Sequence, residues 1–167
     1  REYQLVMPGA AWSGAEAVFD YAEKSPCREH FQFSGFLDFA KLPELYAQSS
    51  MYIFPSHFEG FGLSLLEAMD AGLPCACSNC SSLGELGKDA AILFDPASVQ
   101  EIADAMKTIL SDDECRQSLI RKGQAKAALF SWQKTADGLL AIYQRKITHV
   151  FGVPFFTGTM DEALAQI

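Results

Sequence analysis

The chain has 167 residues, of which 49% are hydrophobic and 20% are charged, and its formal net charge is -8. This composition is typical of one globular domain that buries a core. The acidic balance argues against nucleic acid as a partner, because a sequence-independent nucleic-acid surface needs a stripe of Lys and Arg. The sequence contains no apolar run long enough to span a bilayer and no recognisable signal peptide. It begins with Arg1 rather than Met, so we expect it to be part of a longer protein.

Short apolar runs alternate with longer segments of helical spacing along most of the chain. The short runs predict strands at 3–7, 31–33, 51–54, 74–77 and 91–94. The other segments predict helices at 15–24, 42–49, 62–71, 82–86, 98–110, 112–130 and 131–145. Ser98 and Ser131 are expected to cap the helices that they open, and Gly72 to end the third helix. This alternation predicts parallel βαβ units, and hence an α/β fold with a Rossmann-like, doubly wound sheet.

The chain has five cysteines, which are Cys27, Cys75, Cys77, Cys80 and Cys115. An odd count in a chain of this length does not suggest a disulfide framework. The cluster at 75–80 can be interpreted as a metal site or as part of a buried strand. The strand is the better interpretation, because free Cys behaves as a small hydrophobe and no ligating pair stands out elsewhere in the sequence.

The segment Phe54-Pro-Ser-His-Phe-Glu59-Gly-Phe-Gly62-Leu-Ser-Leu-Leu-Glu67-Ala-Met joins a predicted strand to a predicted helix. In a parallel sheet such a loop lies beyond the carboxyl end of the strand, where ligands bind. Gly60 and Gly62 would let the backbone approach a ligand, and the N–H groups at the start of the helix suit a diphosphate. Together with two carboxylates, these features predict a nucleotide-sugar site.

The two carboxylates of this segment have different expected environments. Glu67 falls in a helix that is apolar nearly all round, so we expect it to be buried and to need a partner or a ligand. Neighbouring hydroxyls, such as those of ribose, could fill that role, and so could a buried Lys or Arg. Glu59 lies on the loop, nearer a transferred sugar, and His57 would form part of the pocket wall. The glycines could also make a simple turn, and the incomplete glycine fingerprint disfavours a nicotinamide-binding domain.

Several further blocks carry a resemblance to a known family in their order and spacing. They are Phe33-Ser-Gly-Phe, Leu45-Tyr-Ala-Gln-Ser-Ser, Glu67-Ala-Met-Asp-Ala-Gly-Leu-Pro, Ser78-Asn-Cys-Ser-Ser-Leu-Gly-Glu85, Phe94-Asp-Pro and Phe130-Ser-Trp132. With the Glu-x7-Glu motif at Glu59 and Glu67, the chain resembles the retaining GT-B glycosyltransferases of family 4, the glycosyl transferases group 1. The resemblance covers about 3–145 and corresponds to the C-terminal, donor-binding half of the GT-B fold.

The resemblance implies a role for each matching position. Glu67 would hold the ribose hydroxyls, and Glu59 would be the catalytic residue close to the donor sugar. The implied donor-binding residues are Gly9, Glu59, Gly60, Phe61, Gly62, Leu63 and Glu67. Enzymes of this family are generally metal-independent, so the resemblance implies no metal and no cofactor beyond the substrate, a UDP- or GDP-linked sugar. Glu85 matches a common family glutamate, for which a structural role is the better interpretation.

The implied activity is the transfer of a hexose from a nucleotide diphosphate sugar to a glycan or a lipid-linked acceptor, with retention of configuration. Such transferases serve polysaccharide biosynthesis, which implies a cytoplasmic location and peripheral association of the parent protein with the inner face of a membrane. A non-catalytic nucleotide-sugar-binding or interaction module is the alternative function. The presence of both Glu59 and Glu67 favours the enzyme.

The sequence also departs from the family pattern at its start. The family's domain opens with a strand and an Arg…Lys pair that neutralises the diphosphate, and nothing before Tyr3 matches them. The first strand is central in the doubly wound order, so we expect a sheet interrupted between the strands at 3–7 and 51–54. The acceptor would bind through an N-terminal domain outside these residues, and we therefore expect no transferase activity from this chain alone.

The last residues depart from the repeating pattern. The run Val150-Phe-Gly-Val-Pro-Phe-Phe-Thr-Gly-Thr-Met-Asp-Glu-Ala-Leu resembles the opening of the WecG/TagA/CpsF glycosyltransferases. We therefore expect a nucleotide-sugar-binding domain at 1–146, followed at 147–167 by a linker and the start of a second enzyme domain. An ordinary C-terminal extension that packs on the first domain is the alternative.

Overall fold

The computed structural model describes residues 3–11 and 14–151. Within them the elements run β1 (Leu5–Pro8), α1 (Glu16–Lys24), the 3-10 helix η1 (Arg28–His30), β2 (Phe31–Gly35), the 3-10 helix η2 (Phe39–Lys41), α2 (Leu42–Gln48), β3 (Tyr52–Phe54), α3 (Leu63–Asp70), β4 (Cys75–Ser78), α4 (Ser81–Gly87), β5 (Ile92–Phe94), α5 (Val99–Ser111), α6 (Asp113–Ala127) and α7 (Trp132–Phe151). Every strand and helix predicted from the sequence is present. The α/β class is therefore confirmed, and the two 3-10 helices are additions.

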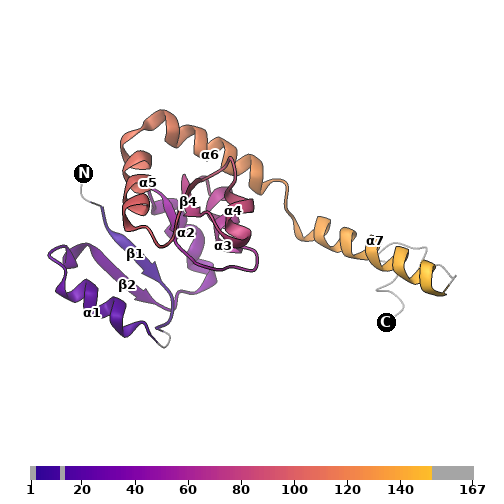
Figure 1. Cartoon of the computed structure of the whole chain (residues 1–167), viewed down its shortest axis with the longest axis horizontal. Helices are drawn as coiled ribbons and strands as arrows, with labels where there is room; N and C mark the ends of the chain where they lie inside the picture. Colours follow the sequence, from indigo (N-terminus) through magenta and orange to yellow (C-terminus); the bar gives the residue numbers. More distant parts are fainter. Residues whose placement is uncertain (1–2, 12–13, 152–167) are drawn as a thin grey trace.

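All described strand pairs are parallel, and they form two sheets. One sheet pairs β1 with β2, and the other has the order β3-β4-β5. Figure 1 shows β1, β2 and α1 as one group beside a second group that contains β4 and the helices α2 to α6. No pairing joins β1 to β3 in the described part of the chain, so the sheet is interrupted where the sequence predicts an interruption.

Strand β4 is the centre of the larger sheet, and all its residues are buried. Cys75 and Cys77 face one hydrophobic cluster, whose members include Leu65, Met69 and Leu83 of α3 and α4. Ala76 faces the opposite cluster, which includes Phe94, Ala105, Ile109 and Leu119. Because successive side chains of a strand point to opposite faces, both faces of β4 are covered by helices, as in a doubly wound sheet.

The buried cysteines confirm the strand interpretation of the 75–80 cluster. Cys75 and Cys77 are fully buried, and burial raises the pKa of each thiol to about 12. Both thiols therefore stay protonated at neutral pH and pack as small hydrophobes. Within residues 3–11 and 14–151, no three His, Cys, Asp or Glu side chains gather as ligands for a metal ion.

The structure confirms two predicted helix caps. It contradicts the predicted end of the last helix. The Ser98 Oγ accepts a hydrogen bond from the Glu101 N–H at 3.2 Å, and the Ser131 Oγ accepts one from the Lys134 N–H at 3.2 Å. Helix α7, however, continues to Phe151 instead of ending at 145, so the predicted boundary at 146/147 falls inside a helix. Most of the tail, 152–167, lies outside the described residues, and the division into two units stays a prediction.

Helix α7 projects away from the rest of the chain (Figure 1). Its apolar side chains are correspondingly exposed, including Trp132 at 78%, Leu139 at 48%, Ile142 at 49% and Tyr143 at 56%. In the described structure, these four side chains belong to neither hydrophobic cluster of the core. Among the helices described, none combines the length and the apolar content needed to cross a membrane.

The packing of α4 on β4 leads to a testable prediction at Gly87. A Cβ added there would lie 2.6 Å from the Sγ of the fully buried Cys77 and 2.9 Å from the Cδ2 of the partly exposed Leu93. Gly87→Ala should therefore lower the free energy of unfolding by about 1–3 kcal/mol in chemical unfolding.

Gly138→Ala in α7 is the matched control, because a Cβ there meets nothing within 4 Å. It should raise the stability of the helix by about 0.5–1 kcal/mol. Equal effects of the two substitutions would contradict the described packing of α4 on β4.

Candidate functional site

The candidate site lies beyond the carboxyl ends of β3 and β4. These strands are parallel neighbours, with Phe54 paired to Cys77, so the chain segments that follow them meet at the same edge of the sheet. The segment after β3 is the loop 55–62, which we call the central loop. The segment after β4 is the start of α4. Ligands bind at this edge in doubly wound folds.

The two glycines of the central loop have different structural surroundings. Gly62 has φ +100° and precedes α3, and an added Cβ would lie 2.8 Å from the Leu83 Cδ2. Gly62 is therefore required by the turn and by the packing of α4, as the simple-turn alternative supposed. At Gly60 an added Cβ would meet nothing within 4 Å, so the open backbone expected for ligand approach lies at Gly60.

Helix α3 begins without a capping side chain. Its first internal hydrogen bonds are those from the Leu65 and Leu66 N–H groups to the Gly62 carbonyl, at 3.1 and 3.3 Å. The side chains beside this start are open to solvent, with Phe61 44% and Leu63 51% exposed. N–H groups at an uncapped helix start carry partial positive charge and can bind phosphate oxygens.

The start of α4 holds the central loop. The Ser81 Oγ accepts a hydrogen bond from the Glu59 N–H at 3.1 Å, and the Ser82 hydroxyl donates to the Glu59 carbonyl at 2.8 Å. The Cys80 thiol donates to the His57 carbonyl at 3.2 Å. Sequence reasoning missed these contacts, since nothing local in the sequence indicates a bond between residues this far apart. His57 contributes its backbone here, and its side chain is exposed.

Glu67 is exposed, so the expectation that it is buried was wrong. In α3, Leu65, Leu66, Ala68 and Met69 face the core, and Glu67 lies on the opposite side with Leu63 and Asp70. Its carboxylate accepts a hydrogen bond at 3.2 Å from the hydroxyl of Tyr46 on α2. No Lys or Arg among the described residues forms an ion pair with Glu67, which removes the alternative of a buried basic partner.

Two tyrosines that the sequence reasoning missed lie beside the carboxylates. The rings of Tyr46 and Tyr52 meet edge to face at 6.1 Å between centroids. Burial is the main cause that raises the pKa of Tyr52 to about 12, and a hydrogen bond with Ser64 lowers it in part. Electrostatic interactions with Cys75, Glu67 and Glu59, in that order, raise the pKa of Tyr52 further. Burial, the neighbouring Tyr52 and Glu67 likewise raise the pKa of Tyr46.

Glu67 also borders a hollow between α2 and α3. The hollow has a volume of about 590 Å³ and is lined by Phe39, Leu42, Pro43, Tyr46, Ala47, Glu67, Asp70 and Ala71. Its walls are mostly apolar, with the Tyr46 hydroxyl and two carboxylates as polar groups. Phe39, Glu67 and Asp70 of its lining are exposed, so the hollow is open to solvent and leaves the Glu67 carboxylate accessible.

Gly9 lies in the other sheet. It follows β1 with φ +144°, and its N–H donates to the Gly35 carbonyl at 2.8 Å. Within the described residues no hydrogen bond connects Gly9 to the central loop. The structure therefore brings Glu59, Gly60, Phe61, Gly62, Leu63 and Glu67 together, while Gly9 stays in the separate β1–β2 sheet.

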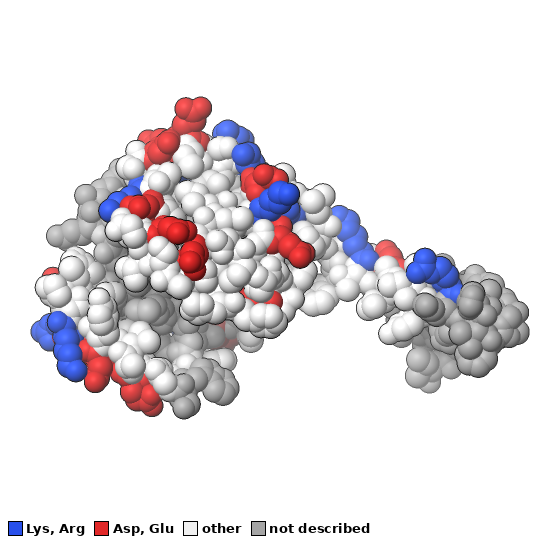
Figure 2. Space-filling view, in the orientation of Figure 1, with Lys and Arg blue, Asp and Glu red and all other residues white. Residues whose placement is uncertain are grey.

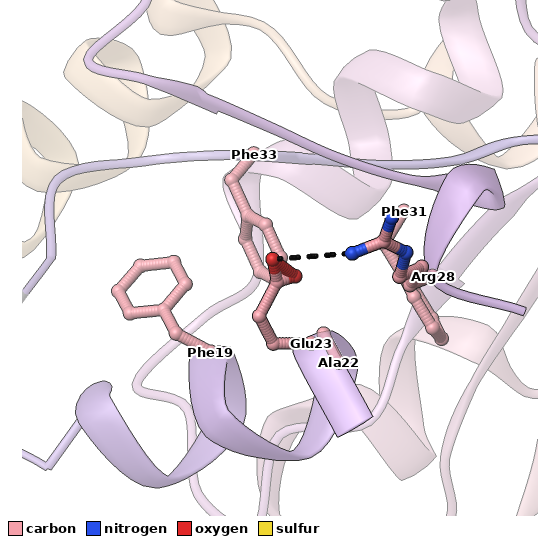
Figure 3. A pocket seen from close by; sticks show the side chains of 6 residues that line it. All are labelled: Phe19, Ala22, Glu23, Arg28, Phe31 and Phe33. Carbon is pink, nitrogen blue, oxygen red and sulfur yellow. Dashed lines mark ion pairs between the residues drawn. The ribbon is translucent and has the colours of Figure 1, made fainter. Parts of the chain in front are cut away.

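A second, smaller hollow lies between α1 and β2 (Figure 3) and contains none of the expected site residues. It has a volume of about 210 Å³, and its lining residues are Phe19, Ala22, Glu23, Arg28, Phe31 and Phe33. The Glu23 carboxylate and the Arg28 guanidinium are 3.7 Å apart, with side chains 73% and 65% exposed. An ion pair this exposed stabilises little, and we interpret the hollow as incomplete packing of α1 on β2.

Charges of both signs are interspersed on the face seen in Figure 2. Lys and Arg side chains lie among Asp and Glu side chains there, and no continuous basic stripe is present on that face. This distribution agrees with the acidic net charge of -8. A sequence-independent nucleic-acid surface would require the opposite pattern.

Comparison with known sequences identifies a family. Residues 1–126 match the family model described as "Glycosyl transferases group 1". The "O-antigen chain mannosyltransferase B" of Escherichia coli is 32% identical over 142 residues, which are 85% of this chain and 37% of that protein. The chain thus spans well under half the length of the curated relatives that it matches.

Comparison with solved structures agrees on the fold. The sucrose-phosphate synthase of Thermosynechococcus elongatus matches with a TM-score of 0.78 and 25% identity, over 87% of this chain and 39% of that one. HepE of Anabaena, solved with UDP and glucose, matches with a TM-score of 0.71 and 23% identity, over 83% of this chain and 40% of that one. The chain therefore shares the fold of GT-B glycosyltransferases.

The tyrosine–carboxylate arrangement predicts an alkaline effect on stability. The pKa of Tyr52 is about 12 in the folded protein, against about 10 for an unfolded tyrosine. Folding thus disfavours the phenolate, and the contribution of the neutral phenol to stability is lost as pH rises from about 10 to about 12. The free energy of unfolding should therefore fall more between pH 8 and pH 11 in the wild type than in Tyr52→Phe.

The measurement is chemical unfolding of both proteins at the two pH values. Tyr21→Phe is the control, because that side chain is 77% exposed and its substitution removes no buried hydroxyl. An identical pH dependence in wild type and Tyr52→Phe would show that the phenol is not in the described environment.

Proposed function

The chain belongs to the glycosyl transferases group 1 family, and on this premise we propose that it is the donor-binding domain of a retaining hexosyltransferase of family 4. The observation that carries the proposal is the placing of two carboxylates around one uncapped helix start. Glu59 precedes the start of α3, Glu67 follows it, and the Tyr46 hydroxyl donates to the Glu67 carboxylate. This arrangement suits a ligand with a diphosphate flanked by two groups rich in hydroxyls.

The donor in this proposal is a hexose linked to UDP or GDP. Its diphosphate would lie against the N–H groups of the first turn of α3, beside Phe61, Gly62 and Leu63. Glu67 would accept hydrogen bonds from the ribose hydroxyls. Its exposure supports this role, because a ligand can reach the carboxylate while the Tyr46 hydroxyl holds it from the other side. The structure of HepE with UDP, a protein of the same fold, is consistent with such a donor.

Glu59 would act at the reacting centre. Its backbone is bonded to Ser81 and Ser82, while its side chain is partly buried and forms no hydrogen bond in the described structure. A carboxylate held in this way can bind the sugar hydroxyls and stabilise the positive charge of an oxocarbenium-like transition state. The retention of configuration in this proposal rests on the resemblance to family 4.

The proposal includes no metal ion and no cofactor. Negative charge that develops on the leaving diphosphate would be stabilised by the N–H groups at the start of α3. Further basic groups would come from residues outside this chain, as the family pattern implies.

The acceptor would be a glycan or a lipid-linked sugar that binds to a domain outside these 167 residues. We place the protein in the cytoplasm, at the inner face of a membrane to which the parent protein binds peripherally. The likeness of the tail to WecG/TagA/CpsF proteins extends the proposal to a fusion of two enzymes. The length of the parent gene is the direct test of the fusion.

The proposal predicts different defects for the two carboxylates in the full-length protein. Glu67→Gln should weaken the binding of the matching nucleoside diphosphate, UDP or GDP, by about tenfold or more, because charge-assisted hydrogen bonds to ribose are lost. Glu59→Gln should leave that affinity nearly unchanged and lower kcat by about a hundredfold or more, because charge stabilisation at the sugar is lost. Titration calorimetry and a screen of UDP- and GDP-linked donors provide the measurements.

Glu85→Gln is the control, since Glu85 is exposed on α4 and makes no contact with the central loop among the described hydrogen bonds. In Glu85→Gln, the affinity for UDP or GDP and the kcat should stay at the wild-type values. Nucleotide binding without any sugar transfer by the full-length protein would contradict the enzyme and support a non-catalytic binding module. Transfer by the 167-residue chain alone would contradict the need for an acceptor domain.

A further inference from the structure

Three successive side chains at the start of α4 bind a different part of the chain instead of their own helix. The residue that precedes α4, Cys80, makes no side-chain cap for this helix. Its thiol donates to the His57 carbonyl at 3.2 Å, and the next two side chains bond to the Glu59 backbone. A Ser at a helix start commonly caps its own helix, so this arrangement is directed at the central loop.

Glu59 is the residue that receives two of these bonds. The Ser81 Oγ accepts from its N–H at 3.1 Å, and the Ser82 hydroxyl donates to its carbonyl at 2.8 Å. Both polar groups of the Glu59 backbone are thereby fixed by neighbouring hydroxyls. We call Ser81 and Ser82 the serine clamp.

The backbone at the serine clamp is strained and closely packed. Ser81 has φ +51°, a left-handed conformation that raises the energy of a non-glycine residue by about 1 kcal/mol or more. In the same turn a Cβ at Gly84 would lie 2.5 Å from the Asn79 carbonyl oxygen, so the backbone of Gly84 packs closely against that of Asn79. The strained conformation places the Ser81 Oγ where it meets the Glu59 N–H.

Other described bonds hold the residues that precede Glu59: the Cys80 thiol donates to the His57 carbonyl, and the Ser56 hydroxyl donates to the Phe58 carbonyl at 3.1 Å. Phe58, which precedes Glu59, is 80% exposed, and a Cβ on Gly60, which follows it, would meet nothing within 4 Å. Among the described hydrogen bonds, those of the Glu59 backbone are the two to the hydroxyls of Ser81 and Ser82.

We propose that Ser81 and Ser82 are positioning residues that fix the backbone of Glu59 and so aim its carboxylate at the transferred sugar. The proposal rests on the proposed function, since it assigns the supporting contacts of the same site. A displacement of about 1 Å at a reacting group can lower a rate by about a hundredfold. The serine clamp thus acts through Glu59 and touches neither the diphosphate nor the ribose.

This position separates the serine clamp from nucleotide binding. The groups assigned to the nucleotide are the start of α3 and Glu67, and the Glu67 carboxylate is held by Tyr46 on α2. The start of α3 packs on Leu83 and Leu86 of α4, but the described hydrogen bonds of Ser81 and Ser82 go to Glu59 and not to α3 or Glu67. Loss of the serine clamp should therefore lower kcat while the affinity for UDP or GDP stays constant.

The test uses the full-length protein with four substitutions and a control. Ser81→Ala and Ser82→Ala should each lower kcat about 10–100-fold and change the Kd of the nucleoside diphosphate less than twofold. Ser82→Thr keeps a hydroxyl and should recover most of the kcat lost in Ser82→Ala. Ser81→Gly removes the Oγ and also the backbone strain, because glycine adopts the left-handed conformation readily. It should therefore lower kcat as Ser81→Ala does, which separates loss of the hydroxyl from backbone strain.

Ser111→Ala is the matched control. Its hydroxyl donates to the Lys107 carbonyl at 2.7 Å within α5, so this hydroxyl-to-carbonyl bond does not involve the central loop. It should leave both kcat and Kd at the wild-type values.

The outcomes separate the serine clamp from the function on which it rests. Wild-type kcat in both alanine variants, or a loss of kcat matched by an equal loss of UDP or GDP affinity, would overturn the serine clamp alone. Absence of both transfer and nucleotide binding in the wild-type protein would overturn the proposed function and the serine clamp with it.

Discussion

The complete burial of β4 is the constraint on which the rest of this structure depends. Both faces of the strand are covered, so its side chains must be small or apolar, and Cys75, Ala76 and Cys77 meet that requirement. The neighbours β3 and β5 pair with it in parallel. As a result, the central loop and the start of α4 emerge at the same edge of the sheet, although they are more than twenty residues apart in sequence.

The close packing around β4 also fixes the frame of the candidate site. Gly87 lies against Cys77, and Gly62 lies against Leu83 of the same helix α4. Helix α4 is thus confined between the strand and the start of α3, and it cannot move without disturbing both. A rigid support of this kind is what a functional loop needs, because catalytic geometry depends on the groups behind the residue that touches substrate.

The sequence predicted the elements and the central segment well because both depend on local patterns. Short apolar runs, glycines and serine caps place the strands and helices, and Glu59 and Glu67 stand out within one loop and helix. Contacts between distant segments have no such signal, and the roles of Tyr46, Tyr52, Ser81 and Ser82 were therefore missed. The expectation that Glu67 is buried failed because Leu63 made the helix look apolar all round, whereas Leu63, Glu67 and Asp70 share one exposed face at helical spacing. The end of α7 was misplaced because an apolar run can continue a helix as readily as it can begin a strand.

The two carboxylates are held in different ways, and the difference fits their proposed roles. Glu67 is oriented through its side chain, by the Tyr46 hydroxyl, so its carboxylate is set before a ligand arrives. Glu59 is held through its backbone, and its carboxylate forms no hydrogen bond within the described residues. A carboxylate that is oriented in advance suits an invariant part of the ligand, such as a ribose. One whose backbone is fixed, and whose carboxylate has no hydrogen-bond partner in the described structure, is left available for the hydroxyls and the developing positive charge of the transferred sugar.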